Sequence, residues 1–192
     1  MKLYDEIQNK LKGVLKESRF EHTIGVMYTA ASMAMAHGYD VDKAMLAGLL
    51  HDCAKCLSYE EQVKICEENN REISEFEKGN RALLHSKAGA ILAKMEYNVT
   101  DEEILHAIEY HTTSVANMNT LDKIIYIADY IEPTRDQAPN LEHIRQLAFS
   151  DLNACLAQIL YDTLEYLNAK GYVIDTITAE SYEFYKGYRK EF

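Results

Sequence analysis

Residues that interrupt helices are scarce in this chain. It has two prolines and eight glycines among 192 residues, and both prolines, Pro133 and Pro139, lie in one short stretch. So few breakers favour long helices joined by short loops. Apolar residues recur every three or four positions, the spacing of an amphipathic helix, in three stretches: residues 20–36, 44–50 and 121–131. The sequence therefore predicts helices in these stretches and a loop between residues 132 and 140.

Strand signals are weak throughout the chain. The best candidate, residues 172–177, is β-branched but short, and no segment alternates convincingly between apolar and polar residues. Helix starts are clearer, because two stretches have the capping-box form, with Ser or Thr at the cap and Glu three residues later. The predicted caps are Ser58 with Glu61, Thr100 with Glu103, and Asp40 or Asp42 for an earlier helix. We predict an all-α fold of nine or ten helices.

The acidic charge of the chain narrows the choice of partners. There are 20 Lys and Arg against 31 Asp and Glu, which gives a net charge of −11, and 47% of the residues are hydrophobic. That hydrophobic share is typical of a globular protein and not of an acidic disordered chain. A long nucleic acid or an anionic membrane surface would require a basic face. We therefore expect no nucleic-acid polymer and no membrane as partners, and any polyanionic small substrate needs positive charge supplied locally.

The sequence shows no segment that would carry it out of the cell or into a membrane. It contains no run of about 18 apolar residues, the length of a membrane span, and its amphipathic, charged N-terminus lacks the apolar stretch of a secretory signal. Its four cysteines are not required as disulfides in a chain of this size. We expect a cytoplasmic location.

The adjacent pair His51-Asp52 is the first candidate for a metal site. It follows the most apolar helical stretch, residues 44–50, so both side chains should emerge at the edge of the core. Neighbouring helical residues project about 100° apart and can approach one ion from two directions. A buried carboxylate without a partner is costly, and a divalent cation is a suitable partner. A His-Asp dipeptide alone is a weak signal, because such pairs also occur by chance.

Further histidines and an aspartate follow in helical, apolar surroundings. Taken singly, each of them fits a structural role better than a ligand role. Taken in chain order, the series is His22, His51-Asp52, His85, His111 and Asp129. The order, more than any single residue, indicates a metal site.

This series resembles the H…HD…D signature of the HD-domain metal-dependent phosphohydrolases, and its two extra histidines resemble the subset that holds two metal ions. The stretches RFEHTIGV, AGLLHDCAK, LLHSKAGA, ILHAIEYHTTS and LDKIIYIADYIEPTR are similar to the YqeK-type family of bacterial HD proteins. The resemblance covers residues 18–150 well and the C-terminal part more loosely. It implies a single HD-type domain over residues 1–192, an HD-domain helical bundle with a core at about 18–135 and additional C-terminal helices at about 140–192.

The same resemblance implies a set of metal ligands. The first ion would be held by four side chains: His22, His51, Asp52 and Asp129. The second would be held by His85 and His111, with Asp52 bridging the two ions. Mixed imidazole and carboxylate ligands suit a divalent transition metal better than calcium. One or two ions are implied; the family favours iron, and manganese or zinc also fits the ligands.

The resemblance also implies the reaction, which is symmetrical hydrolysis of diadenosine tetraphosphate to two ADP. Asp52, Lys55 and Arg135 are the expected catalytic residues, and Lys55 and Arg135 are expected to contact phosphate. The other expected substrate contacts are His85, His111, Thr112, Gly171 and Tyr172. We interpret Arg19 as a surface ion pair. The expected partner is a small nucleotide with ADP- or GDP-like products, and a homodimer is possible.

Two other functions stay open at this point. One is a nucleotidase or phosphodiesterase of the HD type acting on another small nucleotide. The other is a catalytically silent sensor that binds a nucleotide. The Glu103-x-x-His106 motif occurs once, so we interpret His106 as structural, and the Cys53-x-x-Cys56 pair lacks both a second pair for zinc and a redox context.

Overall fold

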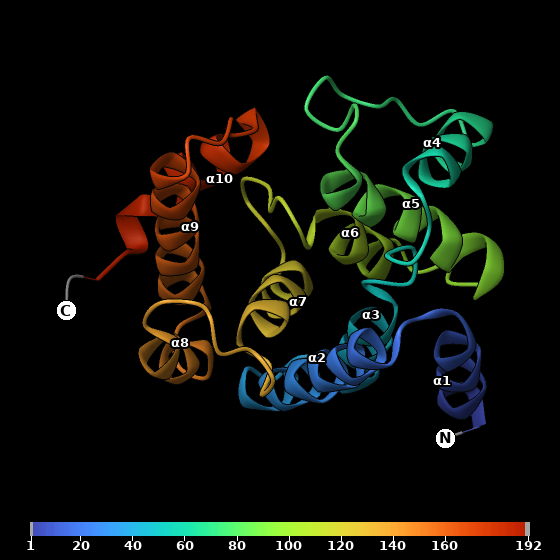
Figure 1. The fold of residues 1–192 in the computed structure, drawn as a ribbon. Coiled ribbons are helices and arrows are strands. Elements are labelled where there is room, and N and C mark those ends of the chain that lie inside the picture. The colour runs from blue at the N-terminus through green and yellow to red at the C-terminus, as the bar shows by residue number, and fades with distance from the viewer. Residues whose placement is uncertain (1, 191–192) are drawn as a thin grey trace.

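The computed structural model describes residues 2–190, which hold ten α-helices, a short 3₁₀-helix (η1) and no β-strand (Figure 1). The first five helices are α1 (Lys2–Val14), α2 (Glu17–Ala36), α3 (Val41–Leu50), α4 (Tyr59–Glu68) and α5 (Arg81–Glu96). The remaining elements are α6 (Glu102–Tyr110), α7 (Thr120–Ile131), α8 (Leu141–Ala148), α9 (Leu152–Ala169), α10 (Thr176–Tyr185) and η1 (Lys186–Tyr188). The predicted all-α fold is confirmed, as is the loop between α7 and α8.

The predicted helix starts are mostly confirmed. Ser58 forms a full capping box with Glu61, and Asp40 caps α3 through Lys43 N. The assignment of Thr100 as the cap of α6 is wrong. Asp101 takes that position, and its side chain accepts a hydrogen bond from Glu103 N. Asp is a good N-cap residue in its own right, so the helix begins one residue later than the Thr100 pattern predicts.

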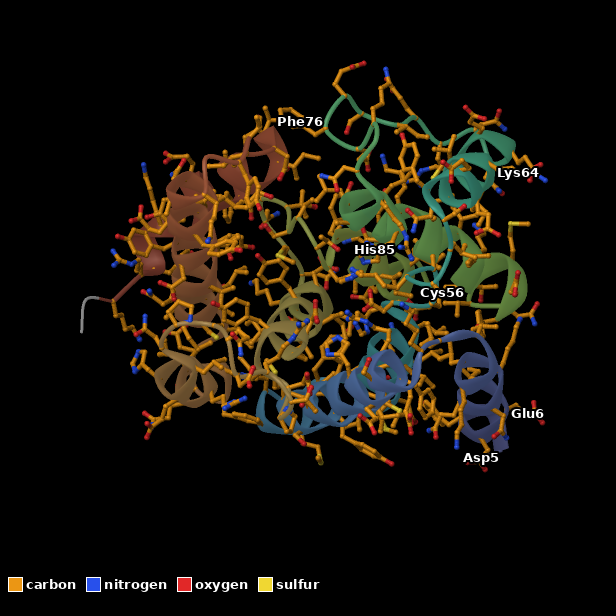
Figure 2. The ribbon with its side chains drawn as sticks, in the orientation of Figure 1. Asp5, Glu6, Cys56, Lys64, Phe76 and His85 are labelled. Carbon is orange, nitrogen blue, oxygen red and sulfur yellow. The ribbon has the colours of Figure 1, made fainter. Side chains whose placement is uncertain are left out.

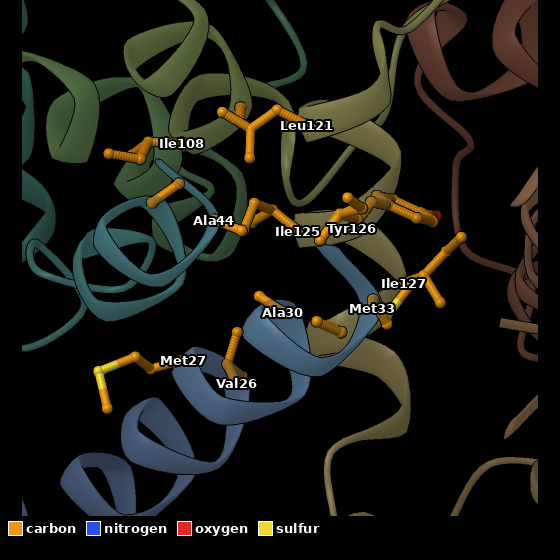
Figure 3. Close-up of a cluster of buried hydrophobic side chains, with 14 of the residues drawn as sticks. Val26, Met27, Ala30, Met33, Ala44, Ile108, Leu121, Ile125, Tyr126 and Ile127 are labelled. Carbon is orange, nitrogen blue, oxygen red and sulfur yellow. The ribbon is translucent and has the colours of Figure 1, made fainter. Parts of the chain in front are cut away.

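Helix α7 lies at the centre of the molecule. It packs against α2, α3, α6, α8 and α9, and Figure 1 shows it between α9 on one side and α2, α3 and α6 on the other. Its residues Ile124, Ile125 and Ile127 are fully buried. Each such side chain stabilises the fold by roughly 1.5–3 kcal/mol relative to exposure. Figure 3 shows Ile125 and Ile127 near side chains of α2, including Ala30. Asp129 is thereby carried on a helix fixed from several sides.

Helices α2 and α3 approach closely because one residue at their contact has no side chain. A Cβ added to Gly48 would lie 3.0 Å from Met27 Cα and 3.3 Å from Val26 O. A bulkier residue would therefore push the two backbones apart. The close approach brings the end of α3, where His51 lies, next to the α2 residue His22.

The C-terminal helices pack on the rest of the bundle. Helix α9 contacts α7, α8, α10 and η1, and its residues Leu156 and Leu160 belong to the same hydrophobic core as Ile125 and Val26. Residues 171–175 form a loop before α10, so the β-branched stretch at 172–177 is no strand. Along residues 2–190, no helix is both long and apolar enough to cross a membrane.

Candidate metal centre

Six histidine and aspartate side chains from five helices and their ends converge in the interior. They are His22 on α2, His51 and Asp52 at the end of α3, His85 on α5, His111 at the end of α6, and Asp129 on α7. All are buried except Asp129, which is partly exposed. Figure 2 shows His85 inside the molecule, whereas Lys64 and Glu6 lie at its edge. The structure therefore brings together every residue of the predicted ligand series.

The Asp52 carboxylate lies between two groups of imidazoles. Its Oδ1 is 3.0 Å from His85 Nε2 and 3.6 Å from His111 Nε2. Its Oδ2 is 3.5 Å from His51 Nε2 and 3.9 Å from His22 Nε2. Each oxygen thus faces a different pair of histidines, which is the arrangement that a bridging carboxylate requires.

Two sets of three side chains are compact enough to hold an ion. In the first, His22, His51 and Asp129 each offer a ligand atom within 4.8 Å of the others, and His22 Nε2 lies 3.0 Å from Asp129 Oδ1. In the second, the same holds for His51, Asp52 and His111. His85 Nε2 lies 3.1 Å from His111 Nε2, so it adjoins the second set.

Hydrogen bonds to the Nδ1 atoms turn three imidazoles toward the centre. His51 Nδ1 lies 2.7 Å from Gly48 O, and His111 Nδ1 lies 2.7 Å from Ile108 O. A carbonyl oxygen only accepts, so Nδ1 carries the hydrogen in both rings, and in the neutral form of each ring Nε2 then holds the lone pair. His22 Nδ1 is held 2.9 Å from a carboxylate oxygen of Glu132. Metal-binding histidines are typically oriented in this way.

Several candidate ligand atoms in the centre make no well-oriented hydrogen bond. Within the described part of the chain, this holds for the buried atoms His22 Nε2, His51 Nε2 and Asp52 Oδ1, although each lies 3.0 to 3.5 Å from a polar atom of another side chain of the centre. A buried polar atom without a partner costs free energy, and a metal ion bound to these atoms would remove that cost. The donor set of imidazole nitrogens and carboxylate oxygens fits a divalent metal.

The protonation states also suit metal binding. Burial alone would raise the pKa of the Asp52 carboxyl, but the surrounding imidazoles outweigh burial and hold it well below its usual range. Burial likewise opposes ionisation of Asp129, yet His22, His51 and Arg135 keep the pKa of that carboxyl well below its ordinary value. Burial lowers the pKa of His85 to about 4. At neutral pH both carboxyls are therefore anionic and His85 is neutral, as ligands must be.

Three basic side chains adjoin the carboxylates. Lys55 Nζ lies 3.0 Å from His85 Nε2 and 3.7 Å from Asp52 Oδ1, and Arg135 donates to Asp129 Oδ1 at 2.6 Å. The interpretation of Arg19 as a surface ion pair is wrong, because its Nη1 donates to the buried Asp52 Oδ2 at 2.8 Å. The reason is the packing of α2 against α3, which places Arg19 over the centre.

A cavity of about 780 Å³ opens beside this centre. Its lining includes Arg19 and six of the predicted site residues, which are His22, Lys55, His111, Thr112, Asp129 and Arg135. Gly171 and Tyr172 do not line it; they lie in the exposed segment that follows α9. Their role in substrate binding stays a prediction without support from this cavity.

Glu132 is a site residue that sequence reasoning missed. It is fully buried beyond the end of α7, and it bonds to His22 Nδ1 and to the backbone N of Thr134. A Cβ added to Gly25 would lie 2.6 Å from its Oε2, so this glycine leaves room for the carboxylate. The signal in the sequence was an acidic residue between the apolar Ile131 and Pro133.

Other candidate residues lie outside the centre. His106 Nδ1 pairs with Asp122 Oδ1 at 2.9 Å, in agreement with its interpretation as structural. All four cysteines are free; Cys53 is buried and Cys56 is exposed. Cys53 Sγ donates to Gly89 O, so it packs as part of the core.

Known proteins resemble this chain over most of its length. The sequence profile of a family described as the HD domain matches residues 19–134, over half of the chain. This chain belongs to the HD-domain family. The predicted membership is confirmed, and the paired His51 and Asp52 that give the HD domain its name lie at the middle of the centre.

Individual HD-domain relatives are similar along almost the full chain. A protein of Halalkalibacterium halodurans, named symmetrical bis(5'-nucleosyl)-tetraphosphatase, is 40% identical across 90% of this chain and 91% of its own length. A Bacillus subtilis protein of the same name is 41% identical across 83% of this chain and 85% of its own length. A solved structure from Clostridium acetobutylicum, described as a predicted HD superfamily hydrolase involved in NAD metabolism, is 41% identical with a TM-score of 0.92, covering 96% and 97%.

Proposed function

We propose that this HD-domain protein is a symmetrical bis(5'-nucleosyl)-tetraphosphatase, which hydrolyses diadenosine tetraphosphate to two ADP. The observation that carries the proposal is the convergence of six His and Asp side chains beside a cavity lined by basic residues. Relatives 40% and 41% identical over most of this chain have that activity as their name. A cavity of about 780 Å³ is large enough for a nucleotide ligand.

We propose that two metal positions share the Asp52 carboxylate. The first ion would be held by His22, His51, Asp52 and Asp129. The second would be held by His85, His111 and Asp52. The separation of the two Asp52 oxygens between two pairs of imidazoles supports this division. Iron is the proposed ion, on the family resemblance, and manganese or zinc satisfies the same donors.

The chemistry follows from the charges at this site. A divalent ion in the centre supplies Lewis-acid activation of water and of a phosphate oxygen. Lys55 and Arg135 bind phosphate oxygens and offset the charge that develops during phosphoryl transfer. The Thr112 hydroxyl donates a hydrogen bond to the same phosphate groups. Burial lowers the pKa of Lys55, while the carboxyls of Asp52 and Asp129 oppose that effect. Water attacks one of the two inner phosphorus atoms and the bond from that phosphorus to the bridging oxygen breaks, so that one ADP gains the water oxygen and the other ADP leaves with the bridging oxygen.

We further propose that the chain forms one HD-type domain, with its core at about 18–135 and its C-terminal helices at about 140–192. The shared hydrophobic core, which joins Leu11 of α1 to Tyr185 of α10, supports one unit. Acidic net charge favours a small nucleotide as the partner over a nucleic-acid polymer. The homodimer stays a prediction.

Incubation of metal-loaded protein with diadenosine tetraphosphate tests the function. Chromatography should show two ADP per substrate consumed. ATP plus AMP would contradict symmetrical cleavage, and binding without turnover would favour the silent sensor. The variant Asp52→Ala should lose both turnover and bound metal, because it removes the carboxylate between the two ligand groups. His106→Ala, which removes a histidine outside the centre, should keep its metal.

A further inference from the structure

Two arginines outside the cavity bond to the backbone of the two residues that are expected to contact phosphate. Arg81 is the first residue of α5, Arg145 lies on α8, and neither lines the cavity. Arg145 Nη2 nevertheless donates to the main-chain oxygen of Arg135, and Arg81 Nη2 donates to that of Lys55. Lys55 and Arg135 both line the cavity. Each of these two basic residues is therefore paired with an arginine that holds its backbone from outside.

Arg145 joins three carbonyls of the segment that ends α7 and follows it. Its Nε donates to Ile131 O at 3.0 Å, and its Nη2 donates to Glu132 O at 3.3 Å and to Arg135 O at 2.9 Å. The last carbonyls of a helix have no helical partner and concentrate negative partial charge, so a cation is favourable there. The Arg145 side chain is partly buried. The segment from 131 to 135 is therefore tied to α8 at its start and at its end.

The side chain of Arg135 is held as well as its backbone. Its Nε donates to Asp129 O at 2.9 Å, and its Nη2 donates to Asp129 Oδ1 at 2.6 Å. Its backbone N donates to Glu132 O at 2.9 Å. Fixing a long side chain costs conformational entropy, and a group that is fixed before binding spares the ligand that cost. Arg135 is thus ordered from two sides, by Asp129 at its guanidinium and by Arg145 at its carbonyl.

The turn between α3 and α4 shows the same arrangement around Lys55. Arg81 Nε donates to Leu57 O at 2.6 Å, and its Nη2 donates to Lys55 O. The buried side-chain amide of Gln62 donates to Ala54 O at 3.2 Å. These bonds hold the carbonyls of the turn against α4 and α5, while the Lys55 side chain lines the cavity. The same type of contact therefore occurs at both basic residues.

We propose that Arg145 and Arg81 are positioning residues for phosphate binding. Arg145 holds Arg135 where its guanidinium binds a phosphate of the substrate, and Arg81 does the same for the ammonium of Lys55. Both act through the residue that they hold, and not on the substrate itself. This inference rests on the proposed function, which assigns the phosphate contacts to Lys55 and Arg135. A guanidinium suits the task because its planar fork donates to two carbonyls at once, whereas a lysine ammonium is a point charge.

Equilibrium binding of ADP to metal-saturated protein tests the inference, because ADP supplies the phosphates without any need for turnover. Arg145→Met keeps the aliphatic part of the side chain and removes its donors. It should weaken ADP binding about fivefold, within the usual range of coupling for residues of one hydrogen-bond network. Arg81→Met should weaken it as well. Arg71→Met is the matched control and should leave ADP affinity unchanged, since Arg71 is exposed, pairs with the Glu109 side chain and lies outside the cavity lining.

Double-mutant cycles show whether the two arginines act through the residues that they hold. Arg135→Ala removes the side chain that Arg145 positions, so Arg145→Met should weaken ADP binding by less than about twofold in that background. The same should hold for Arg81→Met in Lys55→Ala. When the two backgrounds are exchanged, each arginine variant should keep its effect, because the residue that it positions is then present. A role in stability alone would give the same loss in every background.

Folding and metal content are measured for each variant. Arg145→Met gives up three hydrogen bonds and should lower the melting temperature, whereas Arg81 is exposed and its replacement puts folding at little risk. Bound metal is measured because Glu132 lies in the segment that Arg145 holds and contacts the predicted ligand His22. If Arg145→Met does not fold, the cycle of Arg81 with Lys55 decides the inference.

The outcomes separate this inference from the proposed function. Wild-type ADP affinity in both Arg145→Met and Arg81→Met overturns it, even where the wild type produces two ADP. Equal losses with and without the side chains of Arg135 and Lys55 also overturn it, and so does unchanged ADP affinity in Arg135→Ala and Lys55→Ala. Losses that depend on the residue that each arginine holds support it. They do so as well in a wild type that fails to cleave diadenosine tetraphosphate, where the proposed cleavage alone is refuted.

Discussion

Hydrogen bonds at Nδ1 fix the orientation of three imidazoles of the centre. His51 and His111 bond to carbonyls three residues earlier on their own helices, at Gly48 and Ile108. Both residues are the C-caps of their helices, where carbonyl groups have no helical partner. The same bond satisfies the helix end and sets the tautomer of the ligand. His22 lies inside a helix and has no such carbonyl available, and Glu132 fills this role instead.

Glu132→Gln tests this orienting role. The glutamine oxygen can accept a hydrogen bond from His22 Nδ1. The glutamine nitrogen then faces the backbone N–H of Thr134, and two donors meet where Oε2 of Glu132 accepts in the wild type. The charge beside the imidazole is also lost. We expect metal affinity to fall by about 10- to 100-fold, the usual effect of changing an outer partner of a ligand. Calorimetric metal titration of the purified protein measures it.

Glu142→Gln is the matched control, since Glu142 is exposed on α8 and outside the cavity lining. It should bind metal like the wild type. Equal metal affinity in Glu132→Gln and the wild type would contradict the role of Glu132.

Sequence order predicts the members of the centre but not the contacts between them. His22, Asp52 and Asp129 are recognisable as a series because each lies in a helical, apolar setting. The contact between Glu132 and His22 joins residues 110 positions apart and depends on the space that Gly25 leaves. The contact between Arg19 and Asp52 also joins residues that are far apart in the sequence. Local patterns contain no information on such distances.

At the scale of helices, the α2–α3 contact sets the geometry of the centre. Gly48 lets the α3 backbone lie against Met27 and Val26 of α2. His22 and His51 are carried by these two helices, and their rings meet edge to face at 5.4 Å between centroids. A small change in helix separation therefore changes the distance between two predicted ligands.

Gly48→Ala should destabilise the protein, although alanine in a helix normally stabilises by roughly 0.5–1 kcal/mol relative to glycine. The new Cβ would lie 3.0 Å from Met27 Cα, and backbone cannot yield as a flexible side chain does. We expect the free energy of unfolding to fall by about 1–3 kcal/mol, as for other overpacked cores. Turnover should fall as well, because His51 moves relative to His22. Urea denaturation and kcat/KM measure the two effects.

Gly13→Ala provides the contrast. Gly13 is a helical residue of α1 with no atom within 4 Å of an added Cβ. The Gly13→Ala variant should be as stable as the wild type or more stable. If Gly48→Ala behaves in the same way, the close contact does not set the geometry of the centre.

Element boundaries also show where sequence patterns suffice. The apolar spacing over residues 121–131 is sufficient to predict α7, because a helix that is buried on several sides repeats its apolar residues regularly. The start of α6 is different, since Thr100 and Asp101 are both competent caps and only the tertiary fold selects between them. The contact of α9 with the cavity has no local signal, because Asp162 and Tyr166 resemble ordinary residues of an amphipathic helix.

Across the whole molecule, the net charge of −11 coexists with a cavity in which three basic side chains gather. Arg19, Lys55 and Arg135 line one cavity, and each contacts or adjoins a carboxylate of the centre. A metal ion would add positive charge to the same place. The acidic exterior then works against polymers of phosphate, whereas a small polyphosphate can enter the cavity. The fold class and this local charge could be argued from sequence, but the wall formed by α9 could not.

Hydrolysis of diadenosine tetraphosphate in ¹⁸O-labelled water, followed by mass spectrometry of the products, tests the proposed symmetrical cleavage. Water attack on an inner phosphorus breaks the bond to the other half, so the water oxygen enters the terminal phosphate of one ADP and the bridging oxygen stays with the other. Symmetrical cleavage should give ADP as the product, with half of the ADP molecules carrying one label. Label in AMP or in ATP would contradict it.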